Sequence, residues 1–137
     1  MGTMIREDKQ RMSELYTQIA NEIASELPGG WTNMGVCFAV DQNGFETFLV
    51  YYSSDCGRTY RDFMEESFEA DEPAIGLFEA KESCQKLREL CVKSGDRWTQ
   101  LALCVNALGE FTADYNYDPI ETFTPLMLRL WRGRYLK

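Results

Sequence analysis

Two pairs of strand-like segments, each interrupted by a short turn, constrain the fold of this chain more than any other feature. Residues 31–40 and 45–52 are rich in aromatic and β-branched side chains, and Asn43-Gly44 between them favours the positive φ angles of a hairpin turn. Residues 98–106 and 110–117 alternate between apolar and polar side chains around a second glycine-containing turn. Both pairs predict β-hairpins. The first strand is apolar on both of its faces, which predicts a central place in the sheet.

Segments with helical periodicity precede and separate these hairpins. Apolar side chains at a spacing of about 3.6 residues predict a helix over residues 6–27, which ends before Pro28-Gly29-Gly30. A second helix is predicted to begin at Asp71 as its N-cap, with Pro73 in its first turn, and to end near Gly95.

The C-terminal segment also predicts a helix, with two alternative starts. Residues 118–121 have the spacing of a capping box, whereas Thr124 can cap a helix that has Pro125 at its first position. Residues 53–70 have no sustained period, and we interpret them as a connection with room for a short strand. The resulting order, α-β-β-α-β-β-α, predicts an α+β fold in which helices pack on an antiparallel sheet of two hairpins.

The length of the chain bounds its organisation. With 137 residues it is close to the commonest size of one domain, and we expect residues 1–137 to form a single domain. No apolar run approaches the roughly 20 residues of a membrane span. Residues 1–10 carry charges where a signal peptide would have its apolar region. We therefore expect a cytoplasmic protein.

The chain contains five cysteines and no histidine, and this combination excludes several kinds of chemistry. The cysteines are Cys37, Cys56, Cys84, Cys91 and Cys104. Their odd number and a reducing cytoplasm predict reduced thiols, buried as small hydrophobic side chains, with Cys84 and Cys91 on one face of the second helix. Without histidine or a CxxC pair, we expect no metal and no cofactor, and Ser-His or Cys-His catalysis is excluded. Asp114 and Asp118 are the most noticeable carboxylate pair, and we interpret both as solvated or capping side chains.

Charge is unevenly distributed along this acidic chain. The net charge of −8 and the isoelectric point near 4.6 disfavour direct nucleic-acid binding and suit a basic partner, although acidity also serves solubility. Between residues 65 and 82 a single base, Lys81, is outnumbered by seven acids, which are Glu65, Glu66, Glu69, Asp71, Glu72, Glu79 and Glu82. A helix macrodipole explains the acids at 71 and 72 but not the three before them. We therefore predict that this acidic segment contributes to a partner-binding site. Residues 129–137 hold four bases and no acid, which makes them a poor site for a basic partner.

Several short motifs, taken in their order along the chain, resemble one protein family. They are Ile19-Ala20, Leu27-Pro28, Trp31, Tyr51-Tyr52, Trp98-Thr99, Gly109-Glu110-Phe111, Asp114-Tyr115-Asn116-Tyr117-Asp118, Trp131 and Tyr135-Leu136. In this pattern the chain resembles the YezG-like immunity proteins, which bacteria encode beside polymorphic secreted toxins. The resemblance covers nearly the whole chain except residues 53–82, where such proteins are expected to vary with their toxin.

The resemblance implies a protein without enzymatic activity that binds the toxic domain of a secreted effector, often a nuclease, and blocks it in the producing cell. From the acidic charge and the lack of an apolar run of membrane-spanning length, we expect no direct contact with nucleic acid or membrane. Two other functions stay open: a stand-alone regulatory or scaffold module, and an enzyme that uses carboxylates or a cysteine without histidine. A toxin gene beside this one would favour immunity, whereas a deep pocket with a strongly perturbed acid or thiol would favour an enzyme.

Overall fold

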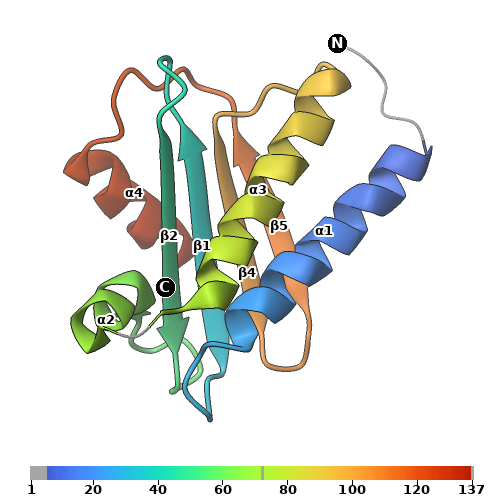
Figure 1. The fold of residues 1–137 in the computed structure, drawn as a ribbon. Helices are drawn as coiled ribbons and strands as arrows, with labels where there is room; N and C mark the ends of the chain where they lie inside the picture. Colours follow the sequence, from blue (N-terminus) through green and yellow to red (C-terminus); the bar gives the residue numbers. More distant parts are fainter. Residues whose placement is uncertain (1–5, 72, 137) are drawn as a thin grey trace. The chain divides into compact units, whose positions relative to one another are not determined.

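The computed structural model describes residues 6–71 and 73–136, and its elements are labelled in Figure 1. In chain order they are α1 (Arg6–Ala24), β1 (Asn33–Val40), β2 (Glu46–Ser53), β3 (Arg61–Asp62), α2 (Phe63–Ala70), α3 (Ile75–Lys93), β4 (Gln100–Asn106), β5 (Phe111–Asn116) and α4 (Pro125–Tyr135). The α+β class, the two hairpins and the three predicted helices are confirmed. In the segment that the sequence indicated as a connection, β3 is the short strand for which there was room, and α2 is an additional helix. No helix within the described ranges is long and apolar enough to cross a membrane.

The five strands form one sheet in the order β3-β2-β1-β4-β5, and every neighbouring pair is antiparallel. β1 lies at the centre, where Val36 is paired with Val50 of β2 on one side and with Leu103 of β4 on the other. Residues 34–40 of β1 are all buried, so neither face of this strand meets solvent. The predicted central place of the first strand is confirmed.

The chain divides into two compact units. One comprises the residues up to 26 together with residues 73–98 and contains α1 and α3. The other comprises residues 27–72 and 99–137 and contains the sheet with α2 and α4. The single domain expected for residues 1–137 stays a prediction.

In the first unit, α1 and α3 contact each other through a buried serine and a glycine. Ser83 of α3 donates a hydrogen bond to Glu22 Oε1 at 2.7 Å and accepts one from Gln18 Nε2 at 3.2 Å. Gly76, in the first turn of α3, lies so close to α1 that a Cβ on it would stand 2.4 Å from the carbonyl oxygen of Glu22. A side chain at position 76 would therefore push the two helices apart.

In the second unit, α4 packs on the sheet through a cluster that joins four elements. Cys37 of β1, Tyr51 of β2, Ala102 of β4 and Trp131 of α4 form its buried centre. The rings of Tyr51 and Trp131 have their centroids 6.1 Å apart. At Gly35 of β1 a Cβ would stand 2.6 Å from a methyl carbon of Leu136, so the end of α4 lies directly over the central strand.

The start of α4 settles the choice between the two predicted helix starts. The Thr124 hydroxyl accepts a hydrogen bond from the Met127 N–H at 3.2 Å, and Pro125 lies in the first turn. Residues 118–121 are not helical. The start at Thr124 is confirmed, because a proline fits the first turn of a helix and would interrupt one that began at residue 118.

Asp71 does not cap the second predicted helix, and that part of the prediction is wrong. Its φ of 52° lies in the left-handed region, which aspartate tolerates better than most residues, and its N–H donates to the Phe68 carbonyl at 3.2 Å. Asp71 thereby ends α2. The next helix, α3, begins at Ile75 after Ala74, which supplies no side-chain cap. The misassignment arose because residues 63–70 form a helix of their own.

Two helical glycines should respond in opposite directions to alanine. Gly76→Ala should lower the free energy of unfolding by about 1–3 kcal/mol, because the added Cβ overlaps the backbone of α1. Gly133→Ala in α4 should raise it by about 0.5–1 kcal/mol, because alanine loses less backbone entropy in a helix. A Cβ at Gly133 meets nothing within 4 Å, so no overlap offsets that gain. Urea denaturation with an unchanged m value measures both, and a Gly76→Ala protein as stable as the parent would contradict the close approach of the helices.

Candidate protein-binding surfaces

The seven acids predicted to bind a partner are spread over two helices and the turn between them. Glu65, Glu66 and Glu69 lie in α2, Asp71 is its C-cap, Glu79 and Glu82 lie in α3, and Glu72 lies outside the described residues. All of those that the structure describes are exposed except Glu66, which is half-buried. Because α2 and α3 belong to different units, the surface of each helix is described separately.

Glu66 anchors α2 on the sheet. The Tyr52 hydroxyl donates a hydrogen bond to Glu66 Oε1 at 2.5 Å, and Arg61 Nε lies 2.5 Å from Glu66 Oε2. Phe63, at the start of α2, meets the Tyr52 ring edge-on with 5.6 Å between centroids. Burial raises the pKa of Tyr52, and the adjacent Glu66 carboxylate raises it further. The Glu66 carboxylate is therefore engaged within the protein and is not available to a partner in the way the exposed acids are.

The remaining acids of α2 differ in their relation to the helix dipole. Asp62 caps α2 and accepts a hydrogen bond from the Glu65 N–H at 3.1 Å. Glu65 and Glu66 occupy the first turn, where the macrodipole favours negative charge, but Glu69 lies in the last turn, where it does not. The expectation that these three acids precede a helix is corrected, since they lie within one. Only Glu69 is left without a structural explanation.

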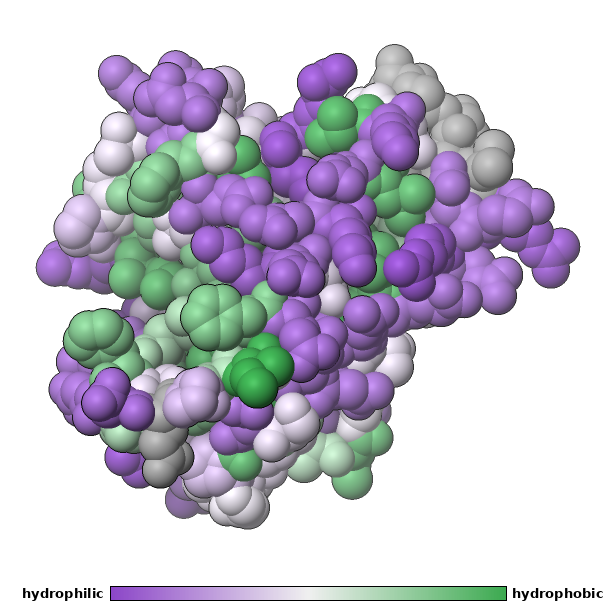
Figure 2. Space-filling view, in the orientation of Figure 1, coloured by the Kyte–Doolittle hydropathy of each residue, from purple (hydrophilic) through white to green (hydrophobic). Residues whose placement is uncertain are grey.

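Exposed apolar side chains interrupt the acidic segment on both helices. Phe68, directly before Glu69 in α2, is 87 % exposed. On α3, Ile75 is 65 % and Phe78 is 70 % exposed. Figure 2 shows hydrophobic surface over α2 and, separately, over the first turns of α3. These positions were missed at the sequence level because residue type does not reveal exposure. The one available signal was the presence of large apolar residues inside an acidic run.

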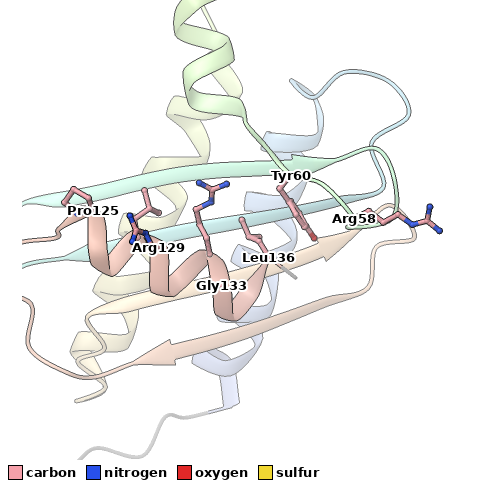
Figure 3. A pocket seen from close by; sticks show the side chains of 8 residues that line it. Arg58, Tyr60, Pro125, Arg129, Gly133 and Leu136 are labelled. Atoms are coloured by element: carbon pink, nitrogen blue, oxygen red, sulfur yellow. The ribbon is translucent and has the colours of Figure 1, made fainter.

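A groove of about 470 Å³ lies between α4 and the loop that joins β2 to β3 (Figure 3). It is lined by Arg58, Tyr60, Pro125, Leu128, Arg129, Arg132, Gly133 and Leu136. Figure 3 shows Tyr60 turned toward α4, and Arg58 at the far end with its guanidinium directed away from the helix. The Arg132 guanidinium lies over the Tyr51 ring, with 5.0 Å between its Cζ and the centroid. The structure thus gathers positive charge at one groove of an acidic chain.

Hydrogen bonds to Asp55 fix the loop that carries Arg58 and Tyr60. The Asp55 carboxylate accepts bonds from Ser53 Oγ at 2.7 Å, from the Thr59 N–H at 2.9 Å and from Thr59 Oγ1 at 2.6 Å. These donors hold the pKa of Asp55 well below its usual range. Although its sequence has no regular period, this loop is ordered by its own side chains and presents one wall of the groove in a defined place.

Asp114 and Asp118 have separate structural contacts. Asp114 of β5 accepts a hydrogen bond from the Tyr135 hydroxyl and lies 3.7 Å from Arg134 Nη2, so it ties the edge strand to α4. The backbone N–H of Asp118 donates to Asn116 Oδ1 at 2.8 Å. Burial raises the pKa of Tyr135 to about 12, with a further contribution from Asp114. Asp114 is exposed, as the interpretation of a solvated side chain expects, and these contacts with α4 are additional to that interpretation.

The five cysteines differ in accessibility, and no disulfide joins any two of them. Cys37, Cys84 and Cys91 are buried, Cys104 is half-buried and Cys56 is exposed. Burial raises the pKa of Cys37 to about 12 and also raises the pKa values of Cys91 and Cys104. The expected burial holds for most of the thiols, and Cys56 is the exception. Within the part of the chain that the structure describes, no three His, Cys, Asp or Glu side chains are grouped so that they could hold a metal ion.

Comparison with known proteins identifies similar sequences over most of the chain. Residues 12–131 match the family described as Immunity protein YezG-like. The chain is 30 % identical over 119 residues to Immunity protein YezG of Bacillus spizizenii (strain ATCC 23059 / NRRL B-14472 / W23), which covers 82 % of this chain and 73 % of that protein. It is also 30 % identical over 119 residues to Immunity protein YezG of Bacillus subtilis (strain 168), which covers 80 % of this chain and 75 % of that protein. The family match includes every strand of the sheet.

Thiol labelling should separate Cys56 from the other cysteines. In the native protein at neutral pH, a maleimide should modify one thiol rapidly and the others slowly, because burial hinders access and a raised pKa lowers the fraction of reactive thiolate. Intact-protein mass spectrometry measures the extent of labelling over time. The Cys56→Ser variant is the control and should lose the rapid phase. Rapid modification of three or more thiols would show that the cysteine burial described above is wrong.

Proposed function

This chain belongs to the YezG-like immunity protein family, and we propose that it is a non-catalytic protein that binds the toxic domain of a secreted toxin and blocks it in the producing cell. The family match over residues 12–131 is the observation that carries this proposal. This match shows that the chain belongs to a family of immunity proteins. The kind of toxin, the mode of inhibition and the contact residues are what we propose beyond the family.

The chemistry of the chain supports a function that does not depend on catalysis. No histidine is present to act as a general base near neutral pH. The raised pKa values of Cys37, Cys91 and Cys104 keep these thiols protonated and poorly nucleophilic. Asp114 is engaged by Tyr135 and Arg134. A protein with this set of side chains is better suited to blocking another protein than to turning over a substrate.

We propose further that the toxin is basic and that it is a nuclease. A nuclease must attract phosphate groups, so its active face carries lysine and arginine side chains. The net charge of −8 on this chain complements such a face and would accelerate association. The same charge opposes direct binding of the chain to nucleic acid, so it suits a protein that covers a nuclease rather than one that competes for the nuclease's substrate.

The proposed contact surface is the acidic segment with its exposed apolar side chains. On α2, Phe68 stands between Glu65 and Glu69, which is the arrangement of an aromatic anchor with a charged rim. On α3, the acids Glu79 and Glu82 share the helix with exposed Ile75 and Phe78. Asp71 and Glu72 lie between these two helices in the sequence and belong to the same proposal. Glu66 contributes indirectly, by holding α2 on β2.

A stand-alone regulatory or scaffold module that binds some other protein is the alternative, and genetics distinguishes the two. We expect the gene to stand beside one for a secreted protein with a variable C-terminal toxin domain, and we expect this chain to act in the cytoplasm. Co-expression with that toxin domain should keep cells alive and yield a co-purifying complex. An unrelated toxin domain is the control and should neither be neutralised nor co-purify. Failure to protect against the neighbouring toxin would overturn the proposed function.

Truncating the aromatic anchor should weaken toxin binding without unfolding the protein. Phe68→Ala should raise the dissociation constant about tenfold or more, because buried aromatic anchors dominate interface energetics. Phe45→Ala is a matched control, since Phe45 is 71 % exposed in the β1–β2 turn and lies outside the proposed surface. Calorimetric titration with the toxin domain measures both affinities. Equal affinities of the two variants would exclude Phe68 from the interface.

Neutralising two acids of α2 should slow toxin capture. The variant Glu65→Gln/Glu69→Gln should show a lower association rate and a weaker dependence of that rate on salt, because complementary surface charge acts mainly by steering. Glu66 is left intact, since its loss would release α2 from Tyr52. Glu89→Gln/Glu121→Gln removes the same charge from exposed positions elsewhere and is the control. Stopped-flow association at several salt concentrations distinguishes them, and identical rates for both double variants would place the docking surface elsewhere.

A further inference from the structure

The basic groove between α4 and the β2–β3 loop is not explained by the acidic surfaces described above. Arg129 and Arg132 line it, and neither forms an ion pair with any residue that the structure describes. In the same unit, Arg61 is paired with Glu66 and Arg134 with Asp114, whereas Arg58, which also lines the groove, forms no ion pair with a described residue. The arginines of this unit that form no ion pair with a described residue therefore all line one groove. Their positive charge is thus available to a ligand.

Gly133 supplies a second, independent observation. It lies inside α4, where glycine is less favourable than alanine, and it lines the groove. A Cβ at this position would meet nothing within 4 Å, and Gly133 is not among the glycines with a positive φ. Neither packing nor backbone conformation within the chain therefore explains the glycine. An occupant of the groove would explain it, because any side chain there would take up part of the space beside Arg129 and Arg132.

The rest of the lining defines what kind of group fits. Tyr60, Leu128 and Leu136 give the groove apolar walls, and the Arg132 guanidinium is held in place over the Tyr51 ring. Guanidinium groups bind carboxylates with two parallel hydrogen bonds, and a side chain of aspartate or glutamate adds an apolar stem for the walls. A volume of about 470 Å³ admits several side chains of a peptide segment.

We propose that this groove receives an acidic segment of the toxin, whose aspartate or glutamate carboxylates pair with Arg129 and Arg132. The inference rests on the proposed function, because the occupant is part of the toxin. It implies that the toxin presents both signs of charge: a basic face toward α2 and a separate acidic segment toward α4. A nucleic-acid strand is the less suitable occupant, because it would extend beyond two arginines onto the surface of a chain with net charge −8.

Arginine variants of α4 test the proposal directly. Arg129→Gln should raise the dissociation constant for the toxin domain about tenfold or more, because it leaves a toxin carboxylate without its partner. Arg132→Gln should do the same, although it also removes the contact with Tyr51. Arg134→Gln is the matched control, since it lies in the same helix, carries the same charge and does not line the groove. The control should bind within about twofold of the parent, and circular dichroism verifies that each variant is folded.

Filling the groove gives a test that does not depend on charge. Gly133→Leu should place a side chain in the groove and weaken toxin binding about as much as Arg129→Gln, while the protein stays folded. Gly133→Ala should weaken binding less and raise the melting temperature by about 3 °C. If Gly133→Ala binds the toxin more weakly although it is more stable than the parent, the weaker binding cannot be attributed to unfolding. The two Gly133 variants together therefore distinguish a blocked groove from an unfolded protein.

The outcomes separate this inference from the proposed function. If the parent fails to bind the toxin domain, the proposed function fails and the groove proposal fails with it. If the parent binds and Arg129→Gln, Arg132→Gln and Gly133→Leu all bind like Arg134→Gln, the groove proposal alone is overturned. A labelled single-stranded oligonucleotide is tested in parallel. Its capture by the parent and its loss in Arg129→Gln, with toxin affinity unchanged, would assign the groove to phosphate and also overturn the proposal.

Discussion

Successive side chains of a β-strand point to opposite faces of the sheet, and in β2 this alternation positions both surfaces on which a partner is proposed to dock. Tyr51 packs against Trp131 of α4, and its neighbour Tyr52 packs against Phe63 of α2. One dipeptide therefore holds two helices on opposite faces of the same strand. The helix on the Tyr51 side carries Arg129 and Arg132, which form no ion pair within the described part of the chain, and the helix on the Tyr52 side carries exposed acids. The separation of charge in this unit follows from the pleat of β2.

The alternation in β2 depends in turn on β1. β1 pairs with β2 along one edge and with β4 along the other, and residues 34–40 are buried on both faces. A shift of one residue in either register would exchange the two faces of the sheet and carry Tyr51 and Tyr52 with them. Because β1 is hydrogen-bonded along both of its edges, a shift of β1 would have to break its pairing with β2 and with β4 together. The central strand thus specifies, through its neighbours, where each helix of the unit can attach.

The elements that could be predicted from sequence are those whose signal is local and periodic. The hairpins were indicated by alternation around turns, and the start of α4 by a proline that fits only one of two helix starts. α2 could not be predicted, because its eight residues span about two turns and only Phe63 of them is buried. A helix this short is stabilised by tertiary contacts rather than by periodicity, here through Glu66 and Phe63 on Tyr52. Missing α2 also led to the wrong role for Asp71.

The candidate surfaces show a similar limit. The acidic run was visible as composition, but composition did not reveal that Glu66 is engaged by Tyr52 and Arg61 while Phe68 is exposed. Arg129 and Arg132 of the basic groove lie in residues 129–137, where the sequence indicated only a poor site for a basic partner. Its second wall comes from a loop more than 60 residues earlier, around Tyr60, and only the fold brings the two together.

The central claim is that a toxin domain docks on α2 and in the groove of α4. Hydrogen–deuterium exchange of the protein alone and in complex with the toxin domain tests it most directly, because it reports backbone protection segment by segment. Slower exchange in residues 63–70, in the loop around Tyr60 and in α4, with α1 unchanged, is the predicted result. A stable complex in which these three segments exchange as they do in the unbound protein would contradict the account.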